Sequence, residues 1–255
     1  MPTLTFRTFM KGSGAALQTS SWPPWLAILA TLGVIAIGQL VPIVLISLLV
    51  AADRDTQAYS NPESLARLFD AKQPALLVAT QAAMALATLF LASRYRKQAT
   101  ATLALVHPPA GSRVFFFAFA LMTVALLALN TLTYTIAPES FFQDFRQFQS
   151  LVKGAEPWLV FAAVAIGAPL WEEFLFRGFL LPSVAQKLGF WPAALLVSAG
   201  WSALHIGYSA FGLIEVFSIG LLFAWLLRQA QSLWVPIACH ATYNGLLFLA
   251  LRTAT

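Results

Sequence analysis

The sequence predicts an all-α protein, a polytopic bundle of about seven or eight transmembrane helices. Of its 255 residues 59% are hydrophobic and only 10% are charged, and the mean hydropathy is +0.76. Soluble domains carry about 25% charged residues. Long stretches without acidic or basic residues recur along the chain. Each is close in length to the roughly 20 apolar residues that a helix needs to cross a bilayer. The single cysteine, Cys239, excludes an intramolecular disulfide framework and a zinc site built from several thiolates.

Three long uncharged stretches predict the membrane spans of the N-terminal part. They are Leu26–Ala52, Ala75–Ser93 and Val114–Ala137. The first apolar run begins near Trp25 and is too long for the hydrophobic region of a cleaved export signal. We therefore expect this run to remain as a membrane anchor.

Two polar segments, 53–74 and 138–156, are expected at the surface. The second contains four phenylalanines at helical spacing, namely Phe141, Phe142, Phe145 and Phe148. This spacing favours an amphipathic helix at the membrane interface. It fits equally well a loop whose aromatic rings dock on neighbouring spans.

The C-terminal part contains four more candidate spans. They are Pro157–Leu181, Leu188–Ile214, Val216–Leu227 and Gln229–Leu251. The total is seven, and an eighth is obtained if the first long stretch or the region around Glu215 is divided differently. Only the C-terminal part carries recognisable motifs. We therefore divide the chain into N-terminal spans and loops at 1–156, about three helices, and a motif-bearing core of about four helices at 157–255.

The basic residues are distributed unevenly around these spans. If the N-terminus is cytoplasmic, one side of the membrane collects eight basic residues and no acidic residue: Arg7, Lys11, Arg94, Arg96, Lys97, Arg113, Lys187 and Arg228. The other side mixes acidic and basic residues. Because cytoplasmic loops are enriched in lysine and arginine, we predict a multi-pass protein of the cell membrane with its N-terminus inside and its C-terminus outside.

Two adjacent glutamates, Glu172 and Glu173, lie within a predicted span. An ionisable group at the centre of a membrane helix costs at least ~2.5–3.5 kcal/mol, so such groups are usually paired and often functional. Glu173 and Arg177 are i,i+4 neighbours in the favourable order for an ion pair, which alone would be a structural pair. Glu172 points about 100° away from Glu173 on an α-helix and is free to face another partner.

Later spans offer partners for Glu172 in His205, His240 and Asn244. His240 and Asn244 are again i,i+4 neighbours and project from one helical face. A buried carboxylate beside an imidazole can hold a water molecule and accept its proton. A second imidazole and a carboxamide can donate hydrogen bonds to a developing oxyanion. These groups suffice to hydrolyse an amide bond.

In this order, the motifs Glu-Glu-x-x-x-Arg, aromatic-x-x-x-His and His-x-x-x-Asn resemble those of the CPBP family of intramembrane proteases. This family is also called the CAAX prenyl protease/bacteriocin-processing or Abi family. The resemblance covers about residues 157–250, and its one departure is Trp201, a conservative aromatic change where the family usually has phenylalanine.

The resemblance implies a role for each matched residue. Glu172 and His205 would activate the hydrolytic water, and His240 with Asn244 would form the oxyanion site. Glu173 and Arg177 would support them. The family has also been described as metalloproteases, in which case a divalent metal such as zinc would bind Glu172, His205 and His240. Three such ligands with one open position match a catalytic zinc site, although we favour activation of water without metal.

The predicted activity is therefore that of an intramembrane endopeptidase. Its partners would be the lipid bilayer and membrane-associated peptides or proteins, such as prenylated CAAX-type or leader-bearing chains, and no nucleic acid. The alternative is a non-enzymatic membrane protein, either a proton- or ion-coupled transporter or a bacteriocin-immunity protein. A transporter could use Glu172, Glu173 and Glu215 along its path, and it would not need Asn244.

Other protease designs are disfavoured by what the sequence lacks. A His-Glu-x-x-His motif is absent, which argues against a zincin-type protease. An aspartyl dyad in the later spans is impossible because no aspartate follows Asp144. A serine protease that uses Ser209 with His240 as its base would leave Glu172 without a role.

Overall fold

The computed structural model describes residues 5–11, 17, 20–53, 59, 61–94, 98–153 and 156–253. Every regular element in these ranges is helical, which confirms the predicted all-α class. Six helices are long and apolar enough to cross a membrane. The chain is therefore a polytopic helical membrane protein, as its composition predicts.

The helices follow one another with short connections. The N-terminal part contains α1 (Phe6–Lys11), α2 (Pro24–Ala52), α3 (Pro62–Ala92), α4 (Ala99–Thr102), α5 (Arg113–Ile136) and α6 (Pro138–Val152). The C-terminal part contains α7 (Pro157–Phe161), η2 (Ala162–Gly167), α8 (Ala168–Glu172), η3 (Glu173–Leu180), α9 (Leu181–Leu188), α10 (Phe190–Ala203), α11 (Ala210–Ala230) and α12 (Trp234–Thr253). The segments from α7 to α9 form one continuous helix of 32 residues.

The six helices that qualify as spans are α2, α3, α5, the continuous helix at 157–188, α11 and α12. The predicted span Leu188–Ile214 differs from the structure. Its helix, α10, has only 14 residues, a length of about 21 Å against the roughly 30 Å of hydrocarbon. The chain then turns, and α11 begins at Ala210, before the predicted boundary. Ser209 caps α11 by accepting a hydrogen bond from the Gly212 N–H at 3.0 Å.

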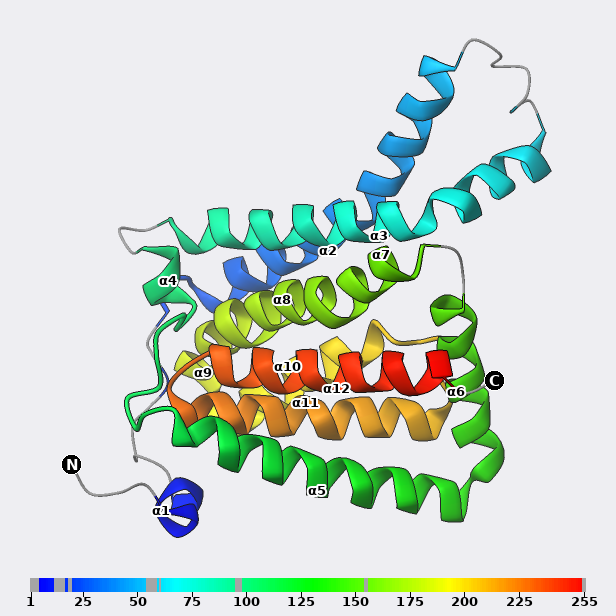
Figure 1. The fold of residues 1–255 in the computed structure, drawn as a ribbon. Helices are drawn as coiled ribbons and strands as arrows, with labels where there is room; N and C mark the ends of the chain where they lie inside the picture. The colour runs from blue at the N-terminus through cyan, green and yellow to red at the C-terminus, as the bar shows by residue number, and fades with distance from the viewer. Residues whose placement is uncertain are drawn as a thin grey trace.

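The segment 53–74, expected to be a surface loop, is helical from Pro62 onwards. Asn61 caps this start, because its side chain accepts a hydrogen bond from the Ser64 N–H at 2.8 Å, and proline suits the first position of a helix. In Figure 1 α2 and α3 both bend along their length, and their connected ends project beyond the rest of the bundle. Each contains an internal proline, Pro42 in α2 and Pro74 in α3, which removes a backbone hydrogen bond and kinks a helix.

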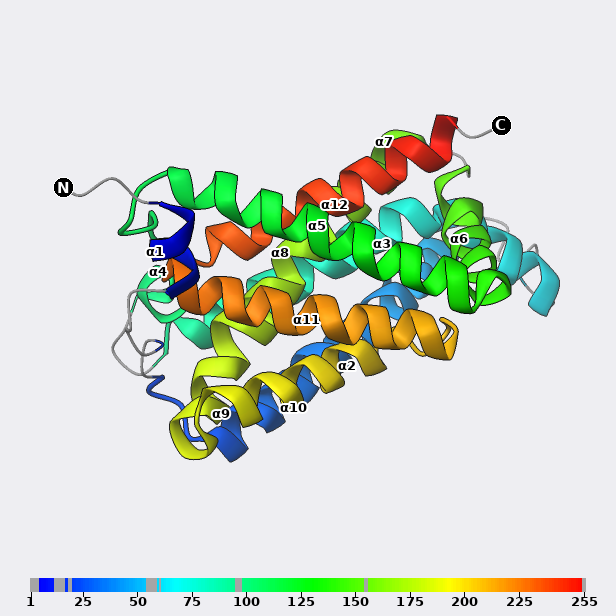
Figure 2. The same ribbon diagram turned by 90° about the horizontal axis from the view of Figure 1, so that it is seen from below.

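The remaining helices surround the continuous helix at 157–188. Its faces contact α3, α10 and α12, and Figure 2 shows α11 between α5 and α10. The predicted phenylalanine-rich helix is present as α6, which lies across one end of the bundle in Figure 1. At the opposite end lies α1. The C-terminal end of α12 lies at the same end as α6.

Two π-helical segments, η2 and η3, flank α8 in the middle of the continuous helix. A π-helical turn contains an extra residue, and such segments are frequent at functional sites. Glu172 is the last residue of α8, and Glu173 is the first of η3. The glutamate pair thus lies where the helix changes its winding.

Candidate active site

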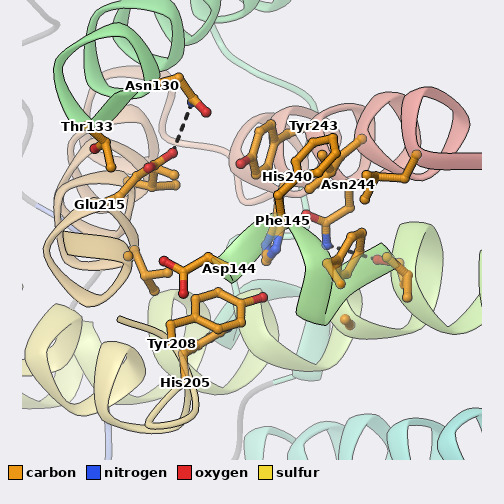
Figure 3. A pocket seen from close by; sticks show the side chains of 18 of the residues that line it. Asn130, Thr133, Asp144, Phe145, His205, Tyr208, Glu215, His240, Tyr243 and Asn244 are labelled. Atoms are coloured by element: carbon orange, nitrogen blue, oxygen red, sulfur yellow. Dashed lines mark hydrogen bonds between the residues drawn. The ribbon is translucent and has the colours of Figure 1, made fainter. Parts of the chain in front are cut away.

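A cavity of about 230 Å³ lies between α5, α6, the continuous helix, the turn after α10, α11 and α12. Its lining includes all four residues predicted to act in catalysis: Glu172, His205, His240 and Asn244. In the close view of Figure 3, His240 and Asn244 enter from α12, while His205 comes from the turn after α10. The structure therefore brings together side chains whose positions in the sequence differ by up to 72 residues (244 minus 172).

Glu172 is buried, with 7% of its surface exposed. Its Oε2 accepts a hydrogen bond from the Trp201 indole Nε1 at 2.5 Å. Phenylalanine could not make this bond, so the aromatic departure from the family pattern is not merely conservative, contrary to the expectation from the sequence. Because Trp201 occupies only one carboxylate oxygen, Oε1 is left for a partner in the cavity.

Glu173 is fully buried and accepts hydrogen bonds from an arginine and a histidine. Its Oε1 accepts hydrogen bonds from Arg177 Nη1 at 3.1 Å and from His240 Nδ1 at 3.0 Å. The predicted i,i+4 pair with Arg177 is therefore present, and the contact with His240 is an addition that the sequence did not reveal. A carboxylate only accepts hydrogen bonds, so His240 Nδ1 carries a proton and its Nε2 is the nitrogen left for the cavity.

Arg177 is also fully buried. Its guanidinium carbon lies 4.1 Å from the centre of the Trp201 ring, a cation–π contact, and 5.6 Å from that of Phe223. Within the described ranges its Nε and Nη2 make no hydrogen bond. The Arg177 charge offsets that of Glu173, so the second glutamate is electrostatically balanced without a contribution from the cavity.

His205 and Asn244 are held by backbone carbonyl groups. His205 Nδ1 lies 3.1 Å from the carbonyl oxygen of Trp201, which fixes the proton on Nδ1 because a carbonyl oxygen cannot donate. Asn244 Nδ2 donates to the carbonyl oxygen of Val164 in η2 at 2.9 Å. Each side chain therefore keeps a polar group for the cavity: His205 its Nε2, and Asn244 its second amide hydrogen.

Glu172 and His205 also line a second cavity of about 410 Å³ between α2, α3 and the continuous helix. Its wall includes Gln39, Gln73 and Gln81. No hydrogen bond joins Glu172 to His205 among the interactions of the described residues. Both side chains line both cavities and therefore lie where the two cavities adjoin.

Tyr208 belongs to the cavity wall but was not singled out from the sequence. It follows His205 by three residues in the turn after α10, where its N–H donates to the His205 carbonyl oxygen at 2.9 Å, and its ring centre lies 5.6 Å from that of the His205 imidazole. Burial raises the pKa of the Tyr208 hydroxyl, and the nearby carboxylates of Glu172, Asp144 and Glu215 raise it further. The hydroxyl therefore stays protonated at neutral pH and is available as a donor.

Glu172, His205 and His240 are the residues predicted to bind a divalent metal. Across the described ranges, no group of three or more histidine, cysteine, aspartate and glutamate side chains is arranged to hold a metal ion. Glu172 Oε1 and the Nε2 atoms of His205 and His240 have no hydrogen-bond partner among the described residues. Metal binding by these three residues therefore stays a prediction, and we derive no step through a metal.

Comparisons with known proteins match the same part of the chain. Residues 154–246 match the model of the family described as type II CAAX prenyl endopeptidase Rce1-like. The protein named "Putative membrane peptidase YdiL" from Bacillus subtilis (strain 168) is 28% identical over 90 residues, 35% of this chain and 36% of that protein. The chain therefore matches about a third of the length of this relative. No solved structure matches the chain.

These matches confirm the resemblance to the CPBP family that the three motifs predict. The matched segment contains every predicted site residue, from Glu172 to Asn244. Over residues 154–246, the chain is therefore similar to a family of CAAX prenyl endopeptidases. The first 153 residues lie outside the matched segment.

Proposed function

We propose that this protein is an intramembrane endopeptidase that hydrolyses a peptide bond inside the cavity by means of an activated water molecule. The observation that carries the proposal is that Glu172, His205, His240 and Asn244, from separate helices and a turn, line one cavity. The match to a family of CAAX prenyl endopeptidases supports the reaction class.

In the proposed reaction, a water molecule lies between Glu172 Oε1 and His205 Nε2. Glu172 accepts a proton from this water as the oxygen attacks the carbonyl carbon of the substrate. The carbonyl π electrons move to its oxygen, which becomes an oxyanion. When the carbonyl re-forms, the C–N bond breaks, and the proton held by Glu172 passes to the departing nitrogen.

His240 and Asn244 would stabilise the oxyanion. The second amide hydrogen of Asn244 and a proton on His240 Nε2 supply two donors, and preorganised donors of this kind stabilise developing charge strongly in a site that excludes bulk water. Because Nδ1 of His240 already donates to Glu173, donation from Nε2 requires the imidazolium form. Glu173 Oε1 accepts the hydrogen bond from Nδ1 and so orients the imidazole, and Arg177 in turn holds Glu173 in place.

Substrates are proposed to be membrane-associated peptides or proteins, since these already reside beside a site built among membrane helices. Prenylated CAAX-type and leader-bearing chains are the classes that the family resemblance suggests. Their carbonyl would be placed at His240 and Asn244.

The test is cleavage of membrane-anchored peptides by the purified protein in liposomes. Glu172→Gln, His205→Ala and His240→Ala should each lower kcat by about 10²–10⁴-fold, and Asn244→Ala by about 10²–10³-fold. Glu63→Gln serves as the matched control, because Glu63 lies outside the cavity with 80% of its side chain exposed. Chelation of divalent metals should leave the rate unchanged. Full activity in the Glu172→Gln variant would contradict the assignment, and loss on chelation that only zinc restores would contradict metal-free activation.

One observation also favours the alternative, a proton- or ion-coupled transporter. Two cavities meet at Glu172 and His205, as a path for ions through the bundle would require. Proton flux measured in the same liposomes separates the two functions. Flux without cleavage would favour the transporter, and cleavage without flux would favour the protease.

A further inference from the structure

The cavity has a second polar region, formed by Glu215 and Asn130. Glu215 lies in the second turn of α11, and its Oε1 accepts a hydrogen bond from Asn130 Nδ2 at 3.0 Å. Asn130 is in α5, and its Nδ2 also donates to the carbonyl oxygen of Leu126 at 2.9 Å. The carboxamide is therefore fixed by its own helix, and it orients one oxygen of the Glu215 carboxylate.

The charge of Glu215 is not balanced by the wall around it. The titratable side chains that line the cavity are Asp144, Glu172, Glu215, His205, His240, Tyr208 and Tyr243, and no lysine or arginine is among the lining residues. Asp144 is engaged by Ser209, whose N–H and Oγ donate to its two oxygens at 2.8 and 2.6 Å. Glu172 is engaged by Trp201. Glu215, like Glu172, keeps one carboxylate oxygen that no described side chain binds, but Glu172 is the group proposed to activate water, so Glu215 is the carboxylate that remains for a ligand.

A purely structural role would not require this charge. The bond to Asn130 ties α5 to α11, and a glutamine at position 215 would accept the same hydrogen bond. An ionised glutamate among membrane helices carries a free-energy cost unless it is paired with an opposite charge. A cation that enters the cavity with a ligand would offset that cost, because opposite charges attract strongly where water is scarce.

The position of Glu215 indicates which part of a substrate it would meet. Figure 3 shows Glu215 and Asn130 on one side of the cavity and His240 with Asn244 on the other. A peptide whose scissile carbonyl lies at His240 and Asn244 therefore directs a neighbouring group towards Glu215.

We propose that Glu215, oriented by Asn130, determines specificity by binding a lysine or arginine side chain near the cleaved bond of the substrate. This inference rests on the proposed endopeptidase function and names a chemical feature of its substrate. An N-terminal ammonium group offers the same chemistry, so the test must separate the two sources of the cation.

The test uses fluorescence-quenched, membrane-anchored peptides in liposomes. One set places a single lysine at each position that flanks the cleaved bond, and a matched set replaces that lysine with norleucine. Both sets are prepared with free and with acetylated N-termini. At one position lysine should raise kcat/KM about tenfold or more over norleucine, with or without acetylation. Dependence on the free N-terminus alone would overturn the assignment to a side chain.

The Glu215→Gln variant removes the negative charge but keeps an oxygen that accepts the hydrogen bond from Asn130. It should remove the preference for lysine, so that the ratio of kcat/KM for the lysine peptide to that for the norleucine peptide falls to about one. Glu63→Gln is again the matched control and should keep the preference. Glu215→Lys should reverse the preference towards a peptide with glutamate at the same position.

The outcomes separate this inference from the proposed function. Equal cleavage of lysine and norleucine peptides by the wild-type protein, or a lysine preference that persists in Glu215→Gln, would overturn the inference while the endopeptidase function stands. If the wild-type protein cleaves none of the peptides, the proposed function fails and the inference fails with it.

Discussion

At the scale of single residues, Trp201 contacts most of the groups that the proposed hydrolysis requires. Its indole N–H donates to Glu172, and its ring lies beneath the Arg177 guanidinium. The same ring stands edge-on to His205 and to His240, with ring centres 5.2 and 5.7 Å apart. One side chain thus fixes the orientation of the carboxylate and fills the space between both histidines.

Replacing Trp201 with phenylalanine removes the N–H and keeps an aromatic ring. A hydrogen bond to a charged group contributes about 1.5–3 kcal/mol, so loss of orientation at Glu172 should lower kcat by about tenfold or more. KM should change less than twofold, since Trp201 acts on the group proposed to activate water and not on the substrate. Steady-state kinetics in liposomes measure both constants.

The control for this prediction is Trp191→Phe, because Trp191 lies at the start of α10 with 52% of its surface exposed. It should leave both constants unchanged. A Trp201→Phe enzyme with wild-type kcat would show that the indole N–H has no positioning role.

Spacing within a helix made part of the site predictable. Glu173 with Arg177, and His240 with Asn244, are i,i+4 pairs, and the structure places each pair together. The bonds from Trp201 to Glu172 and from His240 to Glu173 join residues 29 and 67 positions apart. No periodicity reveals such contacts, because they depend on how separate helices pack.

At the scale of elements, α6 forms one wall of the cavity. Phe141, Phe145 and Phe148 contribute apolar surface to it. Asp144 of α6 accepts hydrogen bonds from Ser209, the residue that caps α11. An added Cβ at Gly212 would collide with the Asp144 carboxylate, so the glycine permits this close approach. Asp144 therefore links α6 to the start of α11 through hydrogen bonds.

Asp144→Ala should loosen α6 specifically. The substitution removes two hydrogen bonds to a carboxylate, each typically worth about 1.5–3 kcal/mol, so amide hydrogen exchange in α6 should accelerate at least about tenfold. Exchange in the continuous helix at 157–188 should not change. Glu139→Ala is the control, since Glu139 is an exposed residue of the same helix. Equal exchange in both variants would show that Asp144 does not anchor α6.

The elements themselves were predictable to different degrees. Long uncharged stretches located α2, α5 and α12 because hydropathy reports the length of apolar helix directly. The break between α10 and α11 escaped prediction, since the uncharged run continues through the turn and its cause is the cap at Ser209. The π segments η2 and η3 were equally hidden, because a change of winding leaves hydropathy unaltered.

At the scale of the whole molecule, the arrangement of the helices places several basic residues at one end of the bundle. The ends of α3, α9 and α11 and the start of α5 lie at the same end of the bundle as α1 (Figure 1). Basic residues near these points in the described ranges are Arg7, Lys11, Arg94, Arg113, Lys187 and Arg228. The opposite end carries α6 and the cavity wall that it contributes. This division agrees in sense with the charge asymmetry that predicts a cytoplasmic N-terminus.

That orientation places α6 on the outer side of the membrane, and it can be tested by labelling. In a Cys239→Ala background, Glu139→Cys should react with a membrane-impermeant maleimide on intact cells. Lys11→Cys should react only after the cells are permeabilised, because lysine and arginine near spans are retained on the cytoplasmic side. The reverse pattern would contradict the prediction and place α6 inside. With α6 outside, substrates would approach Glu215 from the outer half of the bilayer, since Glu215 lies in the second turn of α11 at the same end of the bundle as α6.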